Sequence, residues 1–188
     1  MVFGLDSRWL DSQWLYVGLI GLIVVERCGE LVLTRRNARR LTERGGRAVG
    51  DAHYGWMVVV HATFLAACPI EVICLDRPFV PALGGAMLVV LAATMALRYW
   101  AVTSLGDRWT TRVFVVPGEP PVTRGPYRFL RHPNYLAVVF EIAALPLVHT
   151  AWLTAAVYSV ANALVLRTRI RVEEEALDRY SAPQDPTP

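Results

Sequence analysis

The chain has 188 residues, of which 54% are hydrophobic, and its mean hydropathy is +0.36. This apolar share exceeds the roughly 45–50% of an ordinary soluble domain, so a soluble globular protein is disfavoured and a membrane protein is expected. The net charge of +3 comes from arginine alone, without the interleaved aromatic residues that single-stranded nucleic-acid binding requires. We therefore expect one membrane domain over residues 1–188 and no nucleic-acid partner.

The first membrane segment is predicted at residues 14–33, a run long enough to cross a bilayer. No basic region or small-residue cleavage site precedes it, so we expect no cleaved signal peptide. Glu26, Arg27 and Glu30 interrupt the run. Glu26 and Glu30 are four residues apart and share a helix face, which should point into the protein or lie near the interface. Charge pairing between helices and a catalytic role both remain open for them.

A polar loop with six arginines is predicted at residues 34–55, and the positive-inside rule places it in the cytoplasm. The second segment, residues 56–75, contains Pro69, which should kink the helix. It also contains His61, which is interpreted either as a paired structural residue or as a residue lining a site.

The third segment, residues 82–105, is rich in small residues that allow helices to pack closely. The β-branched run and the prolines of residues 113–121 then predict an extended stretch. Cys28, Cys68 and Cys74 lie inside apolar runs and lack the spacing of a metal site. We interpret them as small buried side chains and expect no metal.

The last apolar stretch, residues 135–166, would be about 48 Å long as one helix, whereas the hydrocarbon core is only ~30 Å thick. Pro146 and the pair His149-Thr150 predict a break, so the stretch should form a hairpin of two short helices. The predicted fold is an all-α integral membrane protein with about five transmembrane segments, at about 14–33, 56–75, 82–105, 135–148 and 151–167, and a C-terminal cytoplasmic helix at about 168–180.

Five segments place the arginine-rich loop, the region before the hairpin and the C-terminal cluster on one side. Asp76 and His149 then lie on the opposite side. The charge bias predicts an external N-terminus, a cytoplasmic C-terminus and a site that is reached from the cytoplasm. The lysine-free, Ala-, Arg- and Val-rich composition is typical of a bacterium, so the inner membrane is the predicted location.

Two polar clusters stand at the ends of the predicted hairpin. Residues 125–135 are Gly-Pro-Tyr-Arg-Phe-Leu-Arg-His-Pro-Asn-Tyr, and the second cluster contains Arg169 and the run Glu173-Glu174-Glu175. Because a hairpin returns the chain to the side from which it started, we expect the two clusters to build one site. A non-catalytic membrane scaffold would give no reason for so many ionisable groups at these two places.

These two motifs, in this order and with one membrane hairpin between them, resemble the isoprenylcysteine carboxyl methyltransferase family and the related phospholipid methyltransferases. The resemblance covers roughly residues 97–177, and bacterial and archaeal members are included in it. After Leu177 relatives commonly continue through a Phe-Gly and several tyrosines, whereas this sequence ends in Ser-Ala-Pro-Gln-Asp-Pro-Thr-Pro. A lid formed by such a tail is therefore not expected here.

The resemblance implies that the cofactor is S-adenosylmethionine and that the two motifs form its pocket. Glu173 and Glu174 could accept hydrogen bonds from the ammonium group or the ribose hydroxyls, while His132 and Tyr135 supply further polar contacts. The residues expected to bind the cofactor are Tyr127, His132, Pro133, Tyr135, Glu173 and Glu174.

The expected reaction is direct methyl transfer to an oxygen atom, driven by alignment and desolvation without a metal or a covalent enzyme intermediate. An ionised carboxylate acceptor needs only a cation to position it, and Arg131 is the candidate. A phenolic or enolic acceptor needs a base, for which Glu141 is the candidate because burial in the hairpin could raise its pKa. Interfacial anchoring by Arg131 and a structural bond from Glu141 to Asn162 are the alternatives.

A site at the membrane implies an acceptor whose tail stays in lipid while its reactive oxygen approaches the methyl donor. Fatty acids, prenylated small molecules and long-chain phenols or alkylpyrones are all admissible, with surrounding membrane lipid and no obligate protein partner. The rival interpretation is an NADPH-dependent membrane sterol or lipid reductase, because such enzymes carry a similar Arg-His-Pro-Asn-Tyr stretch before a hairpin. They usually have an Arg-Asp-Glu cluster and a Lys-Tyr-Gly tail, which this chain lacks.

Overall fold

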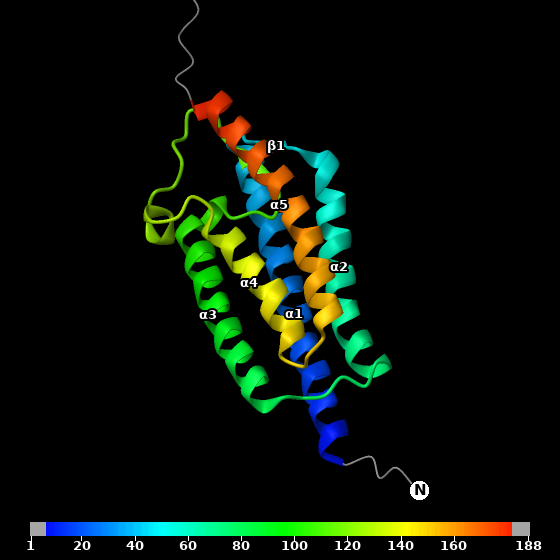
Figure 1. The fold of residues 1–188 in the computed structure, drawn as a ribbon. Coiled ribbons are helices and arrows are strands. Elements are labelled where there is room, and N and C mark those ends of the chain that lie inside the picture. Colours follow the sequence, from blue (N-terminus) through cyan, green and yellow to red (C-terminus); the bar gives the residue numbers. More distant parts are fainter. Residues whose placement is uncertain (1–6, 182–188) are drawn as a thin grey trace, which may run out of the picture.

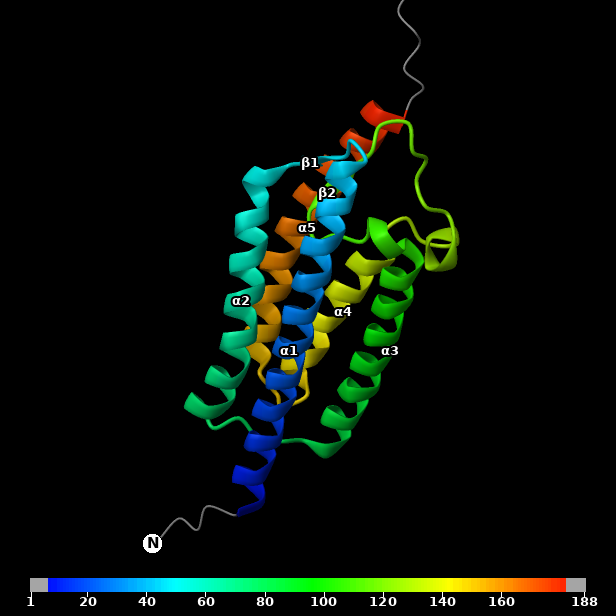
Figure 2. The same cartoon turned by 180° about the vertical axis from the view of Figure 1, so that it is seen from behind.

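The computed structural model describes residues 7–181, with side chains over residues 11–50 and 54–176. This part of the chain forms a bundle of helices that run alternately up and down (Figures 1 and 2). The helices are α1 (Ser7–Glu43), α2 (Asp51–Cys74), α3 (Pro81–Leu105), α4 (Pro133–Leu147) and α5 (Trp152–Ser181), with the short 3₁₀ helices η1 (Gly106–Arg108) and η2 (Gly125–Arg128). Each of the five predicted segments falls on one of the long helices.

The arrangement in space places α4 and α5 in the middle of the bundle, between α3 and α2, with α1 crossing behind them in Figure 1. The end of α1, the start of α2, the start of α4 and the end of α5 gather at one end of the bundle. The connection from α2 to α3 and the turn between α4 and α5 lie at the other end. We call these the motif end and the hairpin-turn end.

Two helical stretches in residues 7–181 are both long and apolar enough to cross a membrane by length and composition, namely Tyr54–Cys74 and Pro81–Arg108. The α4 helix is apolar but shorter. Large apolar side chains also cover the outside of the bundle, among them Leu22, Val89 and Val157. Water disfavours so large an exposed apolar surface, whereas lipid hydrocarbon accommodates it.

The first helix differs from its prediction, because α1 continues to Glu43 through the stretch expected to be a loop. Arginine and leucine are good helix formers, and tertiary contacts hold the extension in place. Asn37 is only 1% exposed, and its Nδ2 donates to the carbonyl oxygens of Gly106 (3.1 Å) and Trp109 (2.9 Å). The connection to α2 is therefore short.

That connection contains the strand β1 (Arg47–Val49), which pairs antiparallel with β2 (Val113–Val115). The register places Arg47 opposite Val115 and Val49 opposite Val113. The strand β2 lies in the stretch that the sequence predicts to be extended. The two-stranded ribbon covers the motif end of the bundle.

The predicted break in the last apolar stretch is confirmed. The α4 helix ends at Leu147 and α5 begins at Trp152, with Pro146 in the last turn of α4 and a positive φ of 54° at Thr150. The expected separate C-terminal helix is instead the continuation of α5 to Ser181. The α5 helix thus carries the second motif back to the start of α4. The tail at residues 182–188, in which the chain departs from its relatives, lies outside the described residues.

The core of the bundle includes Tyr16, Phe64 and Ile142. Cys68 is also buried there, but Cys28 and Cys74 are exposed, so the expectation of three buried cysteines is wrong for two of them. Cys28 lines a cavity between the helices, and Cys74 is the last residue of α2.

Glu71 in α2 binds the beginning of α5. Its carboxylate accepts hydrogen bonds from the backbone N–H groups of Leu153 (3.1 Å) and Thr154 (2.6 Å) and from Nε of Arg77 (2.9 Å). The first N–H groups of a helix have no partner within the helix, and a carboxylate also suits the helix dipole there. Glu71 therefore fixes the hairpin-turn end of α5.

Candidate functional site

The first motif begins with a glycine that the packing requires. Gly125 has a φ of +61°, and a Cβ atom at this position would lie 1.9 Å from Oγ of Ser104 at the end of α3. The positive φ and the close approach both exclude a larger residue without a shift of the chain. Pro126 is buried, and η2 therefore sits firmly against α3.

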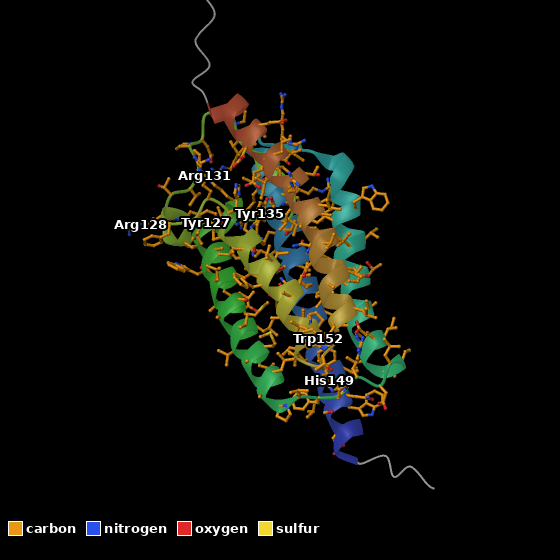
Figure 3. All side chains as sticks on the ribbon, viewed as in Figure 1. Tyr127, Arg128, Arg131, Tyr135, His149 and Trp152 are labelled. Atoms are coloured by element: carbon orange, nitrogen blue, oxygen red, sulfur yellow. The ribbon has the colours of Figure 1, made fainter. Side chains whose placement is uncertain are left out.

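Tyr127 of η2 and Tyr135 of α4 lie at the motif end, close to Arg131, while His149 and Trp152 lie at the opposite end (Figure 3). Burial raises the pKa of Tyr127, and the negative charge of Glu173 raises it further. The Tyr127 phenol is therefore neutral at physiological pH and can donate a hydrogen bond.

The hairpin brings the two motifs into contact. The hydroxyl of Tyr135 donates to Oε2 of Glu173 and accepts from Nε of Arg169 at 2.8 Å. Arg169 and Glu173 are four residues apart on α5 and so present neighbouring side chains on one helix face. The expectation that one site is built from both ends of the hairpin agrees with this geometry.

His132 completes the contact between the motifs. Its ring stacks on that of Tyr135 with centroids 5.1 Å apart. Its Nε2 lies 3.5 Å from Oε1 of Glu174, and its Nδ1 lies 3.9 Å from Oε1 of Glu173. Pro133 is buried at the first position of α4, where its missing N–H costs no helical hydrogen bond.

A cavity of about 560 Å³, which we call the polar cavity, opens at the motif end. It is bounded by the ribbon strand β2, the segment after it, and the two motifs. Five of the six residues predicted to bind the cofactor line it, and Pro133 is the exception. These five are Tyr127, His132, Tyr135, Glu173 and Glu174.

A second cavity of about 520 Å³, which we call the apolar cavity, extends from the same place into the bundle. Aliphatic and aromatic side chains of α1, α2, α4 and α5 form most of its wall, including Leu31, Leu65 and Val138. The two cavities share a set of lining residues that we call the junction. These are Trp109, Thr110, Asn134, Tyr135 and Arg169.

Two buried polar atoms at the junction have no hydrogen-bond partner among the described residues. They are Nε1 of Trp109, a donor, and Oδ1 of Asn134, an acceptor. Buried polar groups are nearly always paired, so unpaired ones that line a cavity indicate a place for a polar ligand group.

A charged cluster of Arg27, Glu30, Arg98 and Glu141 lies on the wall of the apolar cavity. Nη2 of Arg27 donates to both oxygens of Glu141, at 2.7 and 2.8 Å, and Nη2 of Arg98 donates to Oε2 at 2.6 Å. Nη1 of Arg27 donates to Oε2 of Glu30 at 2.5 Å. That contact lies within α1, but Nη1 of Arg98 in α3 also lies 3.5 Å from Oε2 of Glu30, so the structure contains the charge pairing between helices that is one of the two predicted roles for Glu30.

Glu141 differs from both of its predicted roles. Its two oxygens are occupied by guanidinium donors from α1 and α3, so its structural partners are Arg27 and Arg98 rather than Asn162. Oδ1 of Asn162 has no hydrogen-bond partner among the described residues. A carboxylate held in this way is not a free base, because accepting a proton would break two ion pairs.

Arg131 lines the polar cavity and is absent from the wall of the apolar cavity. Its side chain is 89% exposed, and its Nη1 lies 3.9 Å from Oε1 of Glu174. This position groups Arg131 with the residues predicted to bind the cofactor, not with a lipophilic acceptor.

Comparison with known proteins agrees with the geometry. A sequence profile of the isoprenylcysteine carboxyl methyltransferase (ICMT) family matches residues 86–179, which include α4, most of α5 and both motifs. The chain belongs to the ICMT family. Membership indicates a membrane methyltransferase.

Two bacterial relatives of this ICMT-family protein cover most of its length. The uncharacterized protein YpbQ of Bacillus subtilis is 36% identical over 163 residues, which are 87% of this chain and 96% of that protein. An uncharacterized protein of Haemophilus influenzae is 27% identical over 157 residues, which are 82% of this chain and 90% of that protein. Neither name states an activity.

Sequence reasoning missed several residues of this ICMT-family site. Asn134 belongs to the first motif and Trp109 lies outside both motifs, and no signal in the sequence shows that a polar atom of either side chain is unpaired at the junction. Arg169 was noted as part of a motif without a role. The role of His61 was left open, because its position on the wall of the apolar cavity depends on how α2 packs in the bundle.

Proposed function

We propose that the protein transfers a methyl group from S-adenosylmethionine to an oxygen atom of a lipophilic acceptor. The observation that carries this proposal is the junction between a polar and an apolar cavity of similar volume, about 560 and 520 Å³. A water-soluble donor can bind in the polar cavity and a lipid-soluble acceptor in the apolar cavity, so the two reactants come together at the junction. Membership of the ICMT family supports the methyl-transfer chemistry.

The polar cavity suits the donor in size and in chemistry. Its volume of about 560 Å³ lies within the usual range for small-molecule sites. Glu173 and Glu174 offer carboxylate oxygens to an ammonium group or a ribose diol, and His132 adds a further polar contact. Tyr127 and Tyr135 provide aromatic surface for the adenosine.

Arg131 is proposed to bind the carboxylate of the donor rather than that of an acceptor. Its guanidinium group is on the polar cavity and is exposed, so an incoming carboxylate can reach it. Guanidinium and carboxylate groups match in charge and geometry. A purely interfacial anchor would instead leave the affinity for S-adenosylmethionine unchanged in Arg131→Ala.

The junction orients the reacting groups. S-adenosylmethionine, when bound, supplies an electrophilic methyl group, and the protein supplies alignment and exclusion of water. The N–H group of Trp109 and Oδ1 of Asn134 are unpaired there, so the first can donate to the acceptor oxygen and the second can accept from a hydroxyl or ammonium group. Neither role requires either residue to exchange a proton.

The apolar cavity is proposed to take the acceptor from lipid. Several of its lining residues, such as Val24, Leu31 and Val58, are also exposed on the outside of α1 and α2. An apolar tail can therefore extend between these helices into the bilayer. We place the protein in the bacterial inner membrane with the polar cavity on the cytoplasmic side, where S-adenosylmethionine is available.

Titration of the purified protein in detergent with S-adenosylmethionine, followed by calorimetry, tests the proposal. We expect saturable binding that weakens by about 10-fold or more in Glu174→Gln and in His132→Ala, because each substitution removes a polar contact worth roughly 1.5–3 kcal/mol when charge-assisted. Glu175→Gln is the matched control, since Glu175 is exposed on the same helix and does not line the polar cavity.

Wild-type affinity in both variants would remove these residues from the donor site. Saturable binding of NADPH in a parallel titration, without binding of S-adenosylmethionine, would instead favour a reductase and overturn the proposed function.

A further inference from the structure

The apolar cavity contains one imidazole whose chemistry the proposed function does not use. An acceptor oxygen that carries a proton must lose it during methyl transfer, which requires a base within hydrogen-bond reach. Glu141 does not meet this need, because Arg27 and Arg98 occupy its oxygens. His61 of α2 lies on the wall of the same cavity.

The tautomer of His61 is set by its backbone contact. Nδ1 of the ring lies 2.8 Å from the carbonyl oxygen of Met57, one helical turn earlier. A carbonyl oxygen can only accept, so Nδ1 carries the proton and Nε2 carries the free lone pair. Nε2 makes no hydrogen bond to any residue in the described part of the chain.

The position of His61 connects it to the junction. Sδ of Met57 lies 3.1 Å from Nη1 of Arg169, and Nε of Arg169 donates to the hydroxyl of Tyr135 at 2.8 Å. His61 follows Met57 by four residues, which is about 6 Å along the helix axis. Its ring is therefore about one turn away from the junction, on the apolar side, where the head group of a lipophilic acceptor would lie.

We propose, on the basis of the proposed function, that His61 is the general base and that the acceptor attacks through an acidic hydroxyl group. The substrate class is then a long-chain phenol or enol rather than a fatty acid, because an ionised carboxylate has no proton for a base to remove. A lone pair without a partner on a residue that lines the apolar cavity suits a hydroxyl group, which can donate a hydrogen bond to it.

The step balances in atoms and charge. The O–H bond of the acceptor breaks and its proton binds Nε2 of His61. The oxygen's electron pair forms the bond to the methyl carbon, while the electron pair of the carbon–sulfur bond stays on the donor's sulfur. The positive charge of the sulfonium is thus replaced by that of the imidazolium, whose proton leaves to water before the next turnover.

Charged and titratable groups from every neighbouring helix face the same cavity as His61. They are Arg27 and Glu30 of α1, Arg98 of α3, Tyr135 and Glu141 of α4, and Arg169 of α5. Arg27 and Arg98 are paired with Glu30 and Glu141, and Glu26 also lies 3.3 Å from Nη1 of Arg27, so three carboxylates face two guanidinium groups here. The cluster can therefore stabilise one transient positive charge on the imidazole.

The experiment compares two acceptors with the same fifteen-carbon tail, a phenol and a fatty acid, using radiolabelled S-adenosylmethionine and purified protein in detergent. His61→Asn places an amide nitrogen near the former Nδ1 and removes the free ring nitrogen. We expect kcat/KM for the phenol to fall by about 100-fold or more and to lose its rise with pH. Any turnover of the fatty acid should be unchanged.

Thr63→Val is the matched control, because Thr63 is exposed on the same helix and bonds only to backbone carbonyls of its own helix. Its kinetics should match those of the wild type for both acceptors. Equal losses for phenol and fatty acid in His61→Asn would assign His61 a purely structural role and overturn the proposal.

A second readout needs no methyl donor. A nitrophenol with a long alkyl chain changes its absorbance when it ionises, so the pH midpoint of ionisation can be followed while it is bound to the protein. We expect this midpoint to be lower with the wild type than with His61→Asn, because only the wild type offers a base to the hydroxyl. Identical midpoints would overturn the assignment of His61.

The two proposals fail in different ways. Methylation of the fatty acid at equal rates by wild type and His61→Asn, without methylation of the phenol, would overturn the inference and leave the proposed function standing. Absence of S-adenosylmethionine binding, together with no methylation of either acceptor, would overturn both.

Discussion

Arg98 lies deep in the bundle and holds the charged cluster together. Its side chain is 6% exposed and contacts Glu141 at 2.6 Å and Glu30 at 3.5 Å. Glu26 lies 3.3 Å from Arg27, so three carboxylates face two guanidinium groups here. The cluster therefore depends on each of its cations, because removing one partner of a buried pair leaves an uncompensated charge.

Arg98→Gln is expected to lower the free energy of unfolding by about 3 kcal/mol or more, since three carboxylates would share one guanidinium group. Thermal unfolding in detergent measures this as a lower Tm. The double variant Arg98→Gln with Glu141→Gln should recover part of the loss, because it restores the net charge of the cluster. A double variant less stable than Arg98→Gln alone would contradict charge balance as the reason.

His149 makes the stability depend on pH. It is 1% exposed in the turn between α4 and α5, its Nε2 lies 3.2 Å from Oγ of Ser12, and its ring packs against Tyr16 and Phe79. Burial lowers its pKa below the ordinary value. The folded protein therefore keeps His149 neutral at a pH at which the unfolded chain already binds a proton.

The direction of the pH dependence follows from this difference in proton binding between the folded and unfolded states. Stability is fully present above about pH 6.5, the ordinary value for histidine, and decreases as the pH falls below it, because only the unfolded state then gains a proton. Thermal unfolding of wild type and His149→Phe between pH 8 and pH 5.5 tests this. The Tm of the wild type should decrease more steeply than that of His149→Phe as the pH falls. Parallel plots of Tm against pH would show that His149 does not contribute to the pH dependence.

At the scale of elements, η2 depends on its first residue. A Cβ atom on Gly125 would meet Oγ of Ser104 at 1.9 Å and Nε1 of Trp100 at 3.2 Å, at a φ of +61°. Gly125→Ala is therefore expected to displace η2 from α3 and with it Tyr127, weakening binding of S-adenosylmethionine by several-fold or more. Gly118→Ala is the control, because Gly118 also has a positive φ but has open space around it.

Wild-type affinity in Gly125→Ala, measured by the same calorimetric titration, would show that the position of η2 against α3 does not matter for donor binding. If Gly118→Ala lost affinity equally, backbone strain rather than the contact with Ser104 would be the cause.

The helices and the two motifs could be predicted because they leave local signals. Apolar length marks the long helices, and Pro146 with His149-Thr150 marks the break, since proline and turn residues interrupt helices wherever they occur. The extension of α1 to Glu43 could not be predicted in the same way. It depends on the contacts of Asn37 with Gly106 and Trp109, about seventy residues away in the chain.

The same distinction applies to the site. The pairing of Tyr135 with Glu173 follows from a hairpin with a motif at each end, so the contact between the two motifs could be predicted from the sequence. The partners of Glu141 come from α1 and α3, and nothing local in the sequence selects them. Glu141 was the candidate base because of its expected burial alone, without knowledge of these neighbours, and His61 is the base that we propose instead.

For the molecule as a whole, the bundle separates two kinds of surface. Apolar side chains cover the outside of the helices, and the polar cavity with most of its charged rim lies at the motif end. Arg35 and Arg39 on the extension of α1 and Arg124 before η2 are exposed at that same end. The positive-inside rule predicts that this end faces the cytoplasm and that the hairpin-turn end faces outward.

Cysteine labelling of intact cells tests this topology in a background from which Cys28, Cys68 and Cys74 have been replaced. His149 is buried and unsuitable as a probe, but Asp76 and Trp152 are exposed at the hairpin-turn end. A membrane-impermeant maleimide should label Asp76→Cys and Trp152→Cys in intact cells. It should label Arg124→Cys only after the cells are permeabilised, since the charge bias places this end inside.

The Trp152 position tests whether α4 and α5 each cross the membrane. If they do, residues 124 and 152 lie on opposite sides and differ in labelling, whereas the turn of a hairpin that only dips into the membrane from the cytoplasmic side would be shielded by lipid, and neither residue would be labelled in intact cells. Equal labelling of Trp152→Cys and Arg124→Cys in intact cells would therefore contradict five transmembrane segments. Labelling of Arg124→Cys alone would reverse the orientation and place the polar cavity outside the cell.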